Sequence, residues 1–145
     1  MINWSKVAEA DLRKYPAVKD SLHNIQWRLE EIHSRRFSIS SSADSVPVQG
    51  GGNKTEDRML NLQIEEAELK RQYREALSFV RRVEKSLEHL DSVEREILTL
   101  FSTMRSSAAV ECLISSTGYE RAQIYRKRNE ALAVFTNAMY GFNHS

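Results

Sequence analysis

The chain has 145 residues, 41% of them hydrophobic, and its 21 lysines and arginines nearly balance its 20 aspartates and glutamates. That length allows one domain or two very small ones. A net charge of +1 is too small for the whole molecule to attract nucleic acid, so binding to nucleic acid would need a local basic patch. No window approaches the ~20 apolar residues of a membrane span, and no apolar signal core opens the chain, so we expect a cytoplasmic protein without membrane contact.

The first predicted helix carries a heptad pattern over residues 15–32. Its apolar residues follow one another at steps of three and four, which keeps one face toward a partner helix: Tyr15, Val18, Leu22, Ile25, Leu29 and Ile32. A shorter helix over residues 5–14 is expected before it, with a bend at Pro16. Residues 38–55 hold five serines and three of the five glycines, which predicts a flexible linker.

A second heptad helix is predicted to start at Thr55, because Glu56 and Asp57 place negative charge in its first turn. Its apolar positions continue the same spacing: Leu62, Leu69, Tyr73, Ala76, Val80, Val83, Leu87 and Leu90. The simplest arrangement folds the two helices into an antiparallel hairpin over residues 1–90. An apolar face left over would recruit a second subunit, so we expect a homodimer through these helices.

Residues 91–145 have a different pattern, with three shorter helical segments. Asp91 is a capping candidate before Ile97, Leu98, Leu100 and Phe101, and Ser102–Ser107 breaks that helix. A short helix over residues 108–114 ends in a turn at Gly118, the natural left-handed position. A longer helix then runs from Tyr119 to near Gly141 with a predicted buried face: Ile124, Ala131, Leu132, Phe135, Ala138 and Met139. Short helix, glycine turn and longer helix form the helix-turn-helix outline.

Catalytic and metal-binding patterns are missing from this sequence. The four histidines are scattered, and none has the spacing to an acid and a second histidine that a helical metal site needs. Cys112 lies between Val110 and Leu113, which predicts a small core residue rather than a nucleophile. We therefore expect no enzyme, no metal and no cofactor.

One local basic patch stands out, because four of the six bases of residues 91–145 lie between residues 121 and 128. On charge alone this run fits a solvated helix face as well as a DNA contact. Its place after a glycine turn favours DNA, since a helix in the major groove needs cations and donors that reach base edges. The predicted DNA-binding residues are Arg121, Gln123, Tyr125, Arg126, Lys127 and Arg128.

Residues 117–132 also resemble a known motif. The matching core consists of Ile124-Tyr125-Arg126 and Glu130-Ala131-Leu132, and residues 90–98 form a supporting helix upstream. This stretch is similar to the C-terminal helix-turn-helix of ArpU/RinA-like phage transcriptional regulators. That group itself resembles the last promoter-reading region of bacterial sigma factors. Glu120 stands where the group usually has serine.

The resemblance implies an activator of phage or prophage late genes that binds a promoter or operator and acts with the RNA polymerase of the bacterial host. The expected fold is all-α, with a heptad hairpin over residues 1–90 and a sigma-like three-helix unit over residues 91–145. Two other classes remain open. A DNA-packaging protein of the small-terminase kind would form a ring, and a helical adaptor would not bind DNA at all.

Overall fold

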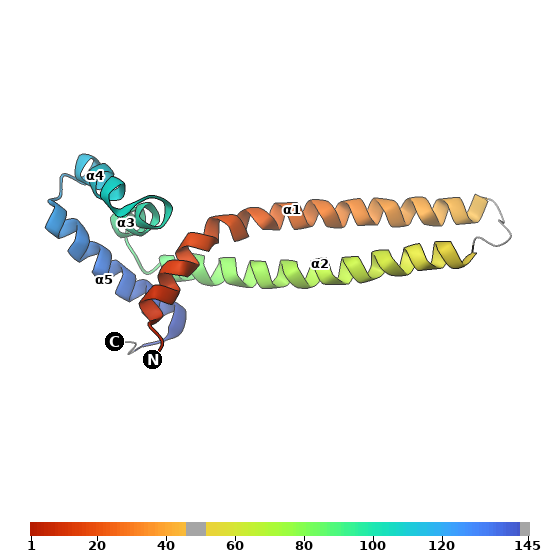
Figure 1. The fold of residues 1–145 in the computed structure, drawn as a ribbon, viewed down its shortest axis with the longest axis horizontal. Helices are drawn as coiled ribbons and strands as arrows, with labels where there is room; N and C mark the ends of the chain where they lie inside the picture. The colour runs from red at the N-terminus through yellow and green to blue at the C-terminus, as the bar shows by residue number, and fades with distance from the viewer. Residues whose placement is uncertain (46–51, 143–145) are drawn as a thin grey trace. The chain divides into compact units, whose positions relative to one another are not determined.

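Five α-helices make up most of the computed structural model, which describes residues 1–45 and 52–142 and has no strand within them. In chain order the helices are α1 (Trp4–Ser45), α2 (Gly52–Leu87), α3 (Ser92–Thr103), α4 (Ser106–Thr117) and α5 (Arg121–Tyr140) (Figure 1). The predicted all-α class is confirmed. None of the described helices combines the length and the apolar character needed to cross a membrane.

α1 differs from the helices predicted for this part of the chain. A single helix runs through Pro16, where two were predicted, and the proline lies at an exposed position. The predicted linker over residues 38–55 is also wrong at its ends, since α1 continues to Ser45 and α2 already begins at Gly52. Ile39 packs against an apolar cluster, and that packing outweighs the poor helix propensity of the serines. Residues 46–51 lie outside the described part.

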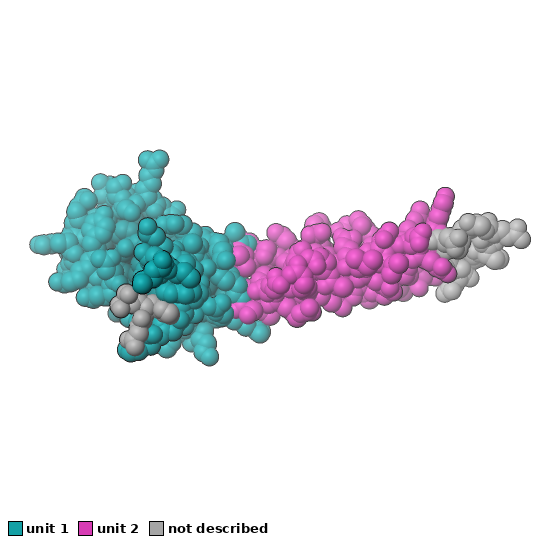
Figure 2. Space-filling view, turned by 60° about the horizontal axis from the view of Figure 1, so that its bottom comes forward, with its two compact units in different colours: residues 1–17, 79–145 teal, residues 18–78 magenta. Residues whose placement is uncertain are grey.

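The described chain forms two compact units whose boundaries cut across the predicted domains (Figure 2). Unit 1 comprises residues 1–17 and 79–145, and unit 2 comprises residues 18–78. Residues 91–145 therefore share their unit with the start of α1 and the end of α2, instead of standing as a domain of their own.

Unit 2 consists of two antiparallel helical segments, one from α1 and one from α2. Their heptad faces meet in a cluster of Ile25, Ile32, Leu62 and Leu69, each no more than 9% exposed. Polar contacts on either side fix the register: Gln26 Nε2 donates to Tyr73 Oη at 2.9 Å, and Arg36 Nη1 lies 2.5 Å from Glu66 Oε2. The two heptad faces that the sequence predicted therefore pack against each other within the chain.

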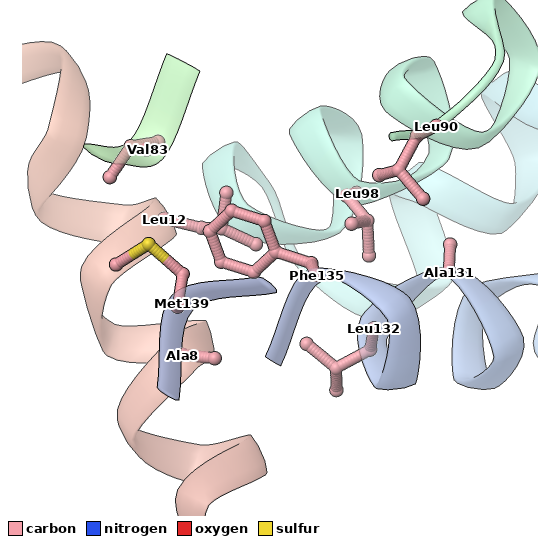
Figure 3. Packing of buried hydrophobic residues seen from close by; sticks show 9 residues of the cluster. All are labelled: Ala8, Leu12, Val83, Leu90, Leu98, Ala131, Leu132, Phe135 and Met139. Carbon is pink, nitrogen blue, oxygen red and sulfur yellow. The ribbon is translucent and has the colours of Figure 1, made fainter. Parts of the chain in front are cut away.

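The core of unit 1 gathers residues from four helices. Phe135 of α5 is fully buried, and Leu12, Leu98 and Met139 surround it in Figure 3. The same cluster contains Ala8, Val83, Leu90, Ala131 and Leu132. One side of the second half of α5 therefore packs against the start of α1, the end of α2 and α3.

Polar contacts reinforce this junction around Tyr140. Its hydroxyl donates to Oδ2 of the buried Asp11, and its ring lies 4.9 Å from the ring of Trp4 between centroids. Arg82 of α2 stacks over the same ring at 5.6 Å and donates from Nη2 to the carbonyl oxygen of Met139 at 3.1 Å. These contacts tie the C-terminal end of α5 to α1 and α2.

Candidate nucleic-acid interface

α3 begins after Asp91, the capping candidate that the sequence indicated, and Asp91 and Glu94 form a capping box. The backbone N–H of Glu94 donates to Asp91 Oδ1 at 2.8 Å, and the Glu94 carboxylate accepts from the Asp91 N–H at 3.2 Å. The hydrogen bond from the Glu94 N–H, with a smaller contribution from the charge of Lys127, holds the pKa of Asp91 below its usual value. This cap fixes where α3 starts after the short turn that follows α2.

The turn between α4 and α5 is built around Gly118. This residue adopts a left-handed conformation with φ of 75°, and its N–H donates to the Ile114 carbonyl at 3.0 Å, which closes α4. The Thr117 hydroxyl donates to the Leu113 carbonyl at 2.6 Å and accepts from the Tyr119 N–H at 3.1 Å. The predicted left-handed glycine is confirmed, and the turn reaches α5 after only three residues.

A small apolar cluster fixes the first half of α5 against the two preceding helices. It consists of Ile97 from α3, Val110 and Leu113 from α4, and Ile124 from α5, all fully buried. Because Ile124 faces this cluster, residues on the other side of the first turns of α5 must face solvent.

These turns carry two exposed arginines, and only Arg126 lies opposite Ile124, because Arg121 precedes Ile124 by three positions and lies about 60° from it around the helix. Arg121 and Arg126 are exposed, and neither has an ion-pair partner within the residues that the structure describes. Gln123 is half-buried in the same segment. Arg126 is two positions beyond the buried Ile124, hence about 200° around the helix from it. Its guanidinium group is therefore free for an external partner.

Tyr125 and Lys127, also predicted to contact DNA, are partly engaged by neighbouring rings. The ring of Tyr125 packs edge-on against Phe101 of α3 at 5.8 Å, and Tyr125 remains 38% exposed. Lys127 Nζ lies 5.3 Å from the centre of the Tyr119 ring. Both side chains therefore lie at the border of the exposed side of α5 and contact neighbouring aromatic rings.

Arg128 has a different environment from the other predicted residues. Its Nη2 donates to Glu9 Oε1 of α1 at 2.5 Å, and its guanidinium group lies 5.5 Å from the centre of the Phe101 ring. The side chain is only 25% exposed. The structure thus separates Arg128 from Arg126 and places it against α1 and α3.

Sequence reasoning missed several residues that shape this surface. Glu9 lies 119 positions from its partner Arg128, so no local pattern could reveal the pairing. Asn129 and Glu130 are exposed beside Arg126, and the helical period alone could have found them. Glu120, by contrast, was already noted in the sequence in place of a serine; it is the N-cap residue of α5, and its side chain makes no capping hydrogen bond.

Other chemistry is sparse in this unit. A pocket beside the Glu9–Arg128 pair has a volume of about 20 Å³, which is far below that of a metabolite site. In the described ranges, no three histidine, cysteine or acidic residues are grouped so as to hold a metal ion. Cys112 is exposed on α4, so its predicted place in the core was wrong. Ala138 is exposed as well, while the other predicted apolar residues of α5 are buried.

The comparisons with known proteins give no family. No family model, no curated protein and no solved structure matches this chain. Function must therefore be argued from the surface of α5 and from the residues around it.

Proposed function

We propose that this protein binds double-stranded DNA through the exposed side of the first half of α5 and regulates transcription. One observation carries the proposal: Arg126 is exposed and unpaired within the described residues, on the side of α5 opposite the buried Ile124, and Arg121, also exposed and unpaired there, begins the same helix. A guanidinium group without a protein partner can bind phosphate or the major-groove edge of guanine without first breaking an ion pair.

The surroundings of the six predicted residues support different roles for them. Arg126 lies in the middle of the exposed side and is assigned to a base edge. Arg121 and Gln123, at the start of the helix, are assigned to neighbouring bases or phosphates. Tyr125 and Lys127, held at the border by aromatic neighbours, are assigned to the DNA backbone. Arg128 is left out of the interface, because Glu9 neutralises it.

The regulatory part of the proposal comes from the resemblance to ArpU/RinA-like phage activators. α4, the turn at Gly118 and α5 supply the short helix, glycine turn and longer helix of that motif. On this basis the target is a promoter or operator, and the protein partner is the RNA polymerase of a bacterial host. The protein would act in the host cytoplasm.

A titration of binding against salt tests the DNA contact. Binding of the full chain to a pool of random duplexes is measured at several salt concentrations, beside Arg126→Ala and Arg81→Ala. Arg81 is an exposed cation of α2, so its substitution removes the same charge from another surface. If Arg126 contacts DNA, Arg126→Ala weakens binding and lowers the slope of log affinity against log salt by up to about 1.

Two results would contradict the proposal. Equal losses in Arg126→Ala and Arg81→Ala would show attraction to overall charge rather than to α5. The absence of any salt-dependent binding to DNA would favour the helical adaptor.

A further inference from the structure

The surface of α2 that faces away from α1 carries an apolar stripe. Leu60 and Ile64 are 54% and 60% exposed, and the exposed Ala67 follows at the next helical step. Their spacing of four and three residues places them on one side of the helix. Leu62 and Leu69, which pack against α1, lie on the opposite side of α2. This stretch of α2 is therefore apolar on two sides, and only one of them is covered within the chain.

We propose that a second copy of this chain covers the outer stripe by packing its own α2 antiparallel against it. In this arrangement Leu60 of each copy packs against Ile64 of the other, and a two-fold axis passes beside residue 62. Such an isologous contact uses the same surface on both copies, so it closes without leaving an open end. It does not rest on DNA binding.

The charges along one edge of the stripe support this register. Glu56 and Lys70 lie on this edge, fourteen residues apart. When two copies of α2 run antiparallel around residue 62, Glu56 of one copy faces Lys70 of the other. On the far edge both Lys54 and Asp57 lie near Glu68 of the second copy, so this edge does not select the register. Two contacts between opposite charges therefore support it, as in antiparallel coiled coils.

Lys70 and Glu68 have ion-pair partners within the monomer that they can exchange for partners in the second copy. Lys70 Nζ lies 2.7 Å from Glu66 and Arg71 binds Glu68, but Lys70, Arg71 and Glu68 are each about half exposed. Exposed ion pairs contribute little stability, so Lys70 and Glu68 can change partners at small cost.

The exposed aromatic residues of α1 in this unit make a poorer surface for a second copy. Trp27 and Phe37 are 68% and 71% exposed, but they lie three helical turns apart. Glu30 and Ser34, both exposed, lie on the same outer side between them. They therefore form no continuous stripe, and they provide a matched control.

The first experiment is sedimentation of the full chain over a range of concentrations. The contact spans residues 54–70, a length of about 25 Å, which is at the small end of stable interfaces and predicts a dissociation constant on the order of micromolar. Leu60→Lys/Ile64→Lys should raise that constant by about 100-fold or more, because four apolar side chains per dimer are replaced by charged ones. Trp27→Lys/Phe37→Lys, with the same gain of charge, should leave it unchanged. A chain that stays monomeric, or a dimer disrupted only by the α1 variant, would overturn the proposal.

A charge exchange tests the register itself. Lys70→Glu should weaken the dimer by placing two glutamates together on each side of the axis. Glu56→Lys/Lys70→Glu should restore it, because opposite charges face each other again. Weakening without restoration would exclude the antiparallel register.

A crosslink provides a readout that does not depend on charge. In a Cys112→Ser background, Gln63→Cys places one thiol of each copy beside the axis and should form a disulfide-linked dimer on mild oxidation. Arg74→Cys, on the outer side of α2 three turns away, should not. Equal crosslinking of both variants would contradict the proposed axis.

Discussion

Arg128 of α5 and Glu9 of α1 are joined by an ion pair with an N–O distance of 2.5 Å, although 119 residues separate them in the sequence. Both side chains are about one-quarter exposed, and the guanidinium group of Arg128 also lies over the ring of Phe101. This pair connects the start of α1 to the middle of α5, next to the proposed DNA surface. It assigns Arg128 to holding α5 within unit 1.

Removal of this pair should affect stability more than DNA binding. Glu9→Ala and Arg128→Ala should each lower the free energy of unfolding by about 1 kcal/mol, and the double variant should lose less than the sum. Denaturant unfolding of all four proteins measures this coupling. If Arg128 instead contacted DNA, Glu9→Ala would release it and tighten binding, so unchanged DNA affinity in Glu9→Ala is the expected result.

The Tyr140–Asp11 hydrogen bond predicts a loss of stability at alkaline pH. Burial, followed by the hydrogen bond to the Asp11 carboxylate, raises the pKa of Tyr140 to about 12. Below about pH 10 the phenol is protonated in both the folded and the unfolded chain. Between about pH 10 and 12 only the unfolded chain loses this proton, so the free energy of unfolding falls as the pH rises.

Tyr140→Phe separates this contribution from the titration of other groups. At neutral pH the variant should be less stable by about 1 kcal/mol, because the buried Asp11 loses a donor. Between pH 10 and 12 it should lose less stability than the unsubstituted chain. Parallel curves for the two proteins over that range would show that Tyr140 does not titrate in this way.

Gly118 should tolerate substitution poorly for a reason of backbone conformation alone. A Cβ atom added there would meet nothing within 4 Å, but the φ of 75° is strained for a residue with a side chain. Gly118→Ala should lower the free energy of unfolding by about 1 kcal/mol, and Gly118→Asn by less, since asparagine adopts this conformation more readily. Thermal unfolding compares the two variants, and equal stability of Gly118→Ala and the unsubstituted chain would contradict the assigned turn.

Glu120 opens α5 without capping it and places a negative charge beside the proposed DNA surface. In Glu120→Ser the hydroxyl can accept from an N–H of the first turn, which should stabilise the chain by up to about 1 kcal/mol. Loss of the negative charge should also tighten DNA binding several-fold. Glu111→Ser, which removes an exposed carboxylate from α4, is the matched control for charge. An equal gain in DNA affinity for both variants would mean that the start of α5 is not close to the DNA.

The local elements of this fold could be predicted because their signals are local. The heptad spacing predicted the faces that carry Ile25 and Leu69, and Asp91 and Gly118 marked helix ends correctly. The prediction that Cys112 lies in the core was wrong. Residues two apart on a helix point about 200° apart, so Cys112 is exposed where Val110 is buried.

Contacts between residues far apart in the chain could not be predicted from the sequence. The serine-rich end of α1 is helical because Ile39 packs against a cluster that includes residues of α2. The same limit applies to Arg128, since charge alone could not distinguish it from Arg126 when its partner Glu9 lies at the other end of the chain. The exposed side of α5 could be predicted from the helical period, but the cations free to bind could not.

Selection of bound sequences from a library of random duplexes and source-genome fragments tests directly whether α5 binds a specific DNA sequence. The unsubstituted chain is compared with Arg121→Ala/Arg126→Ala and with Arg74→Ala/Arg81→Ala, which removes two exposed positive charges from α2. We expect the unsubstituted chain and the α2 variant to enrich the same short motif, and the α5 variant to enrich none. Enrichment of that motif by the α5 variant, or no enrichment by any of the three proteins at near-physiological salt with bacterial RNA polymerase present, would contradict the proposed function.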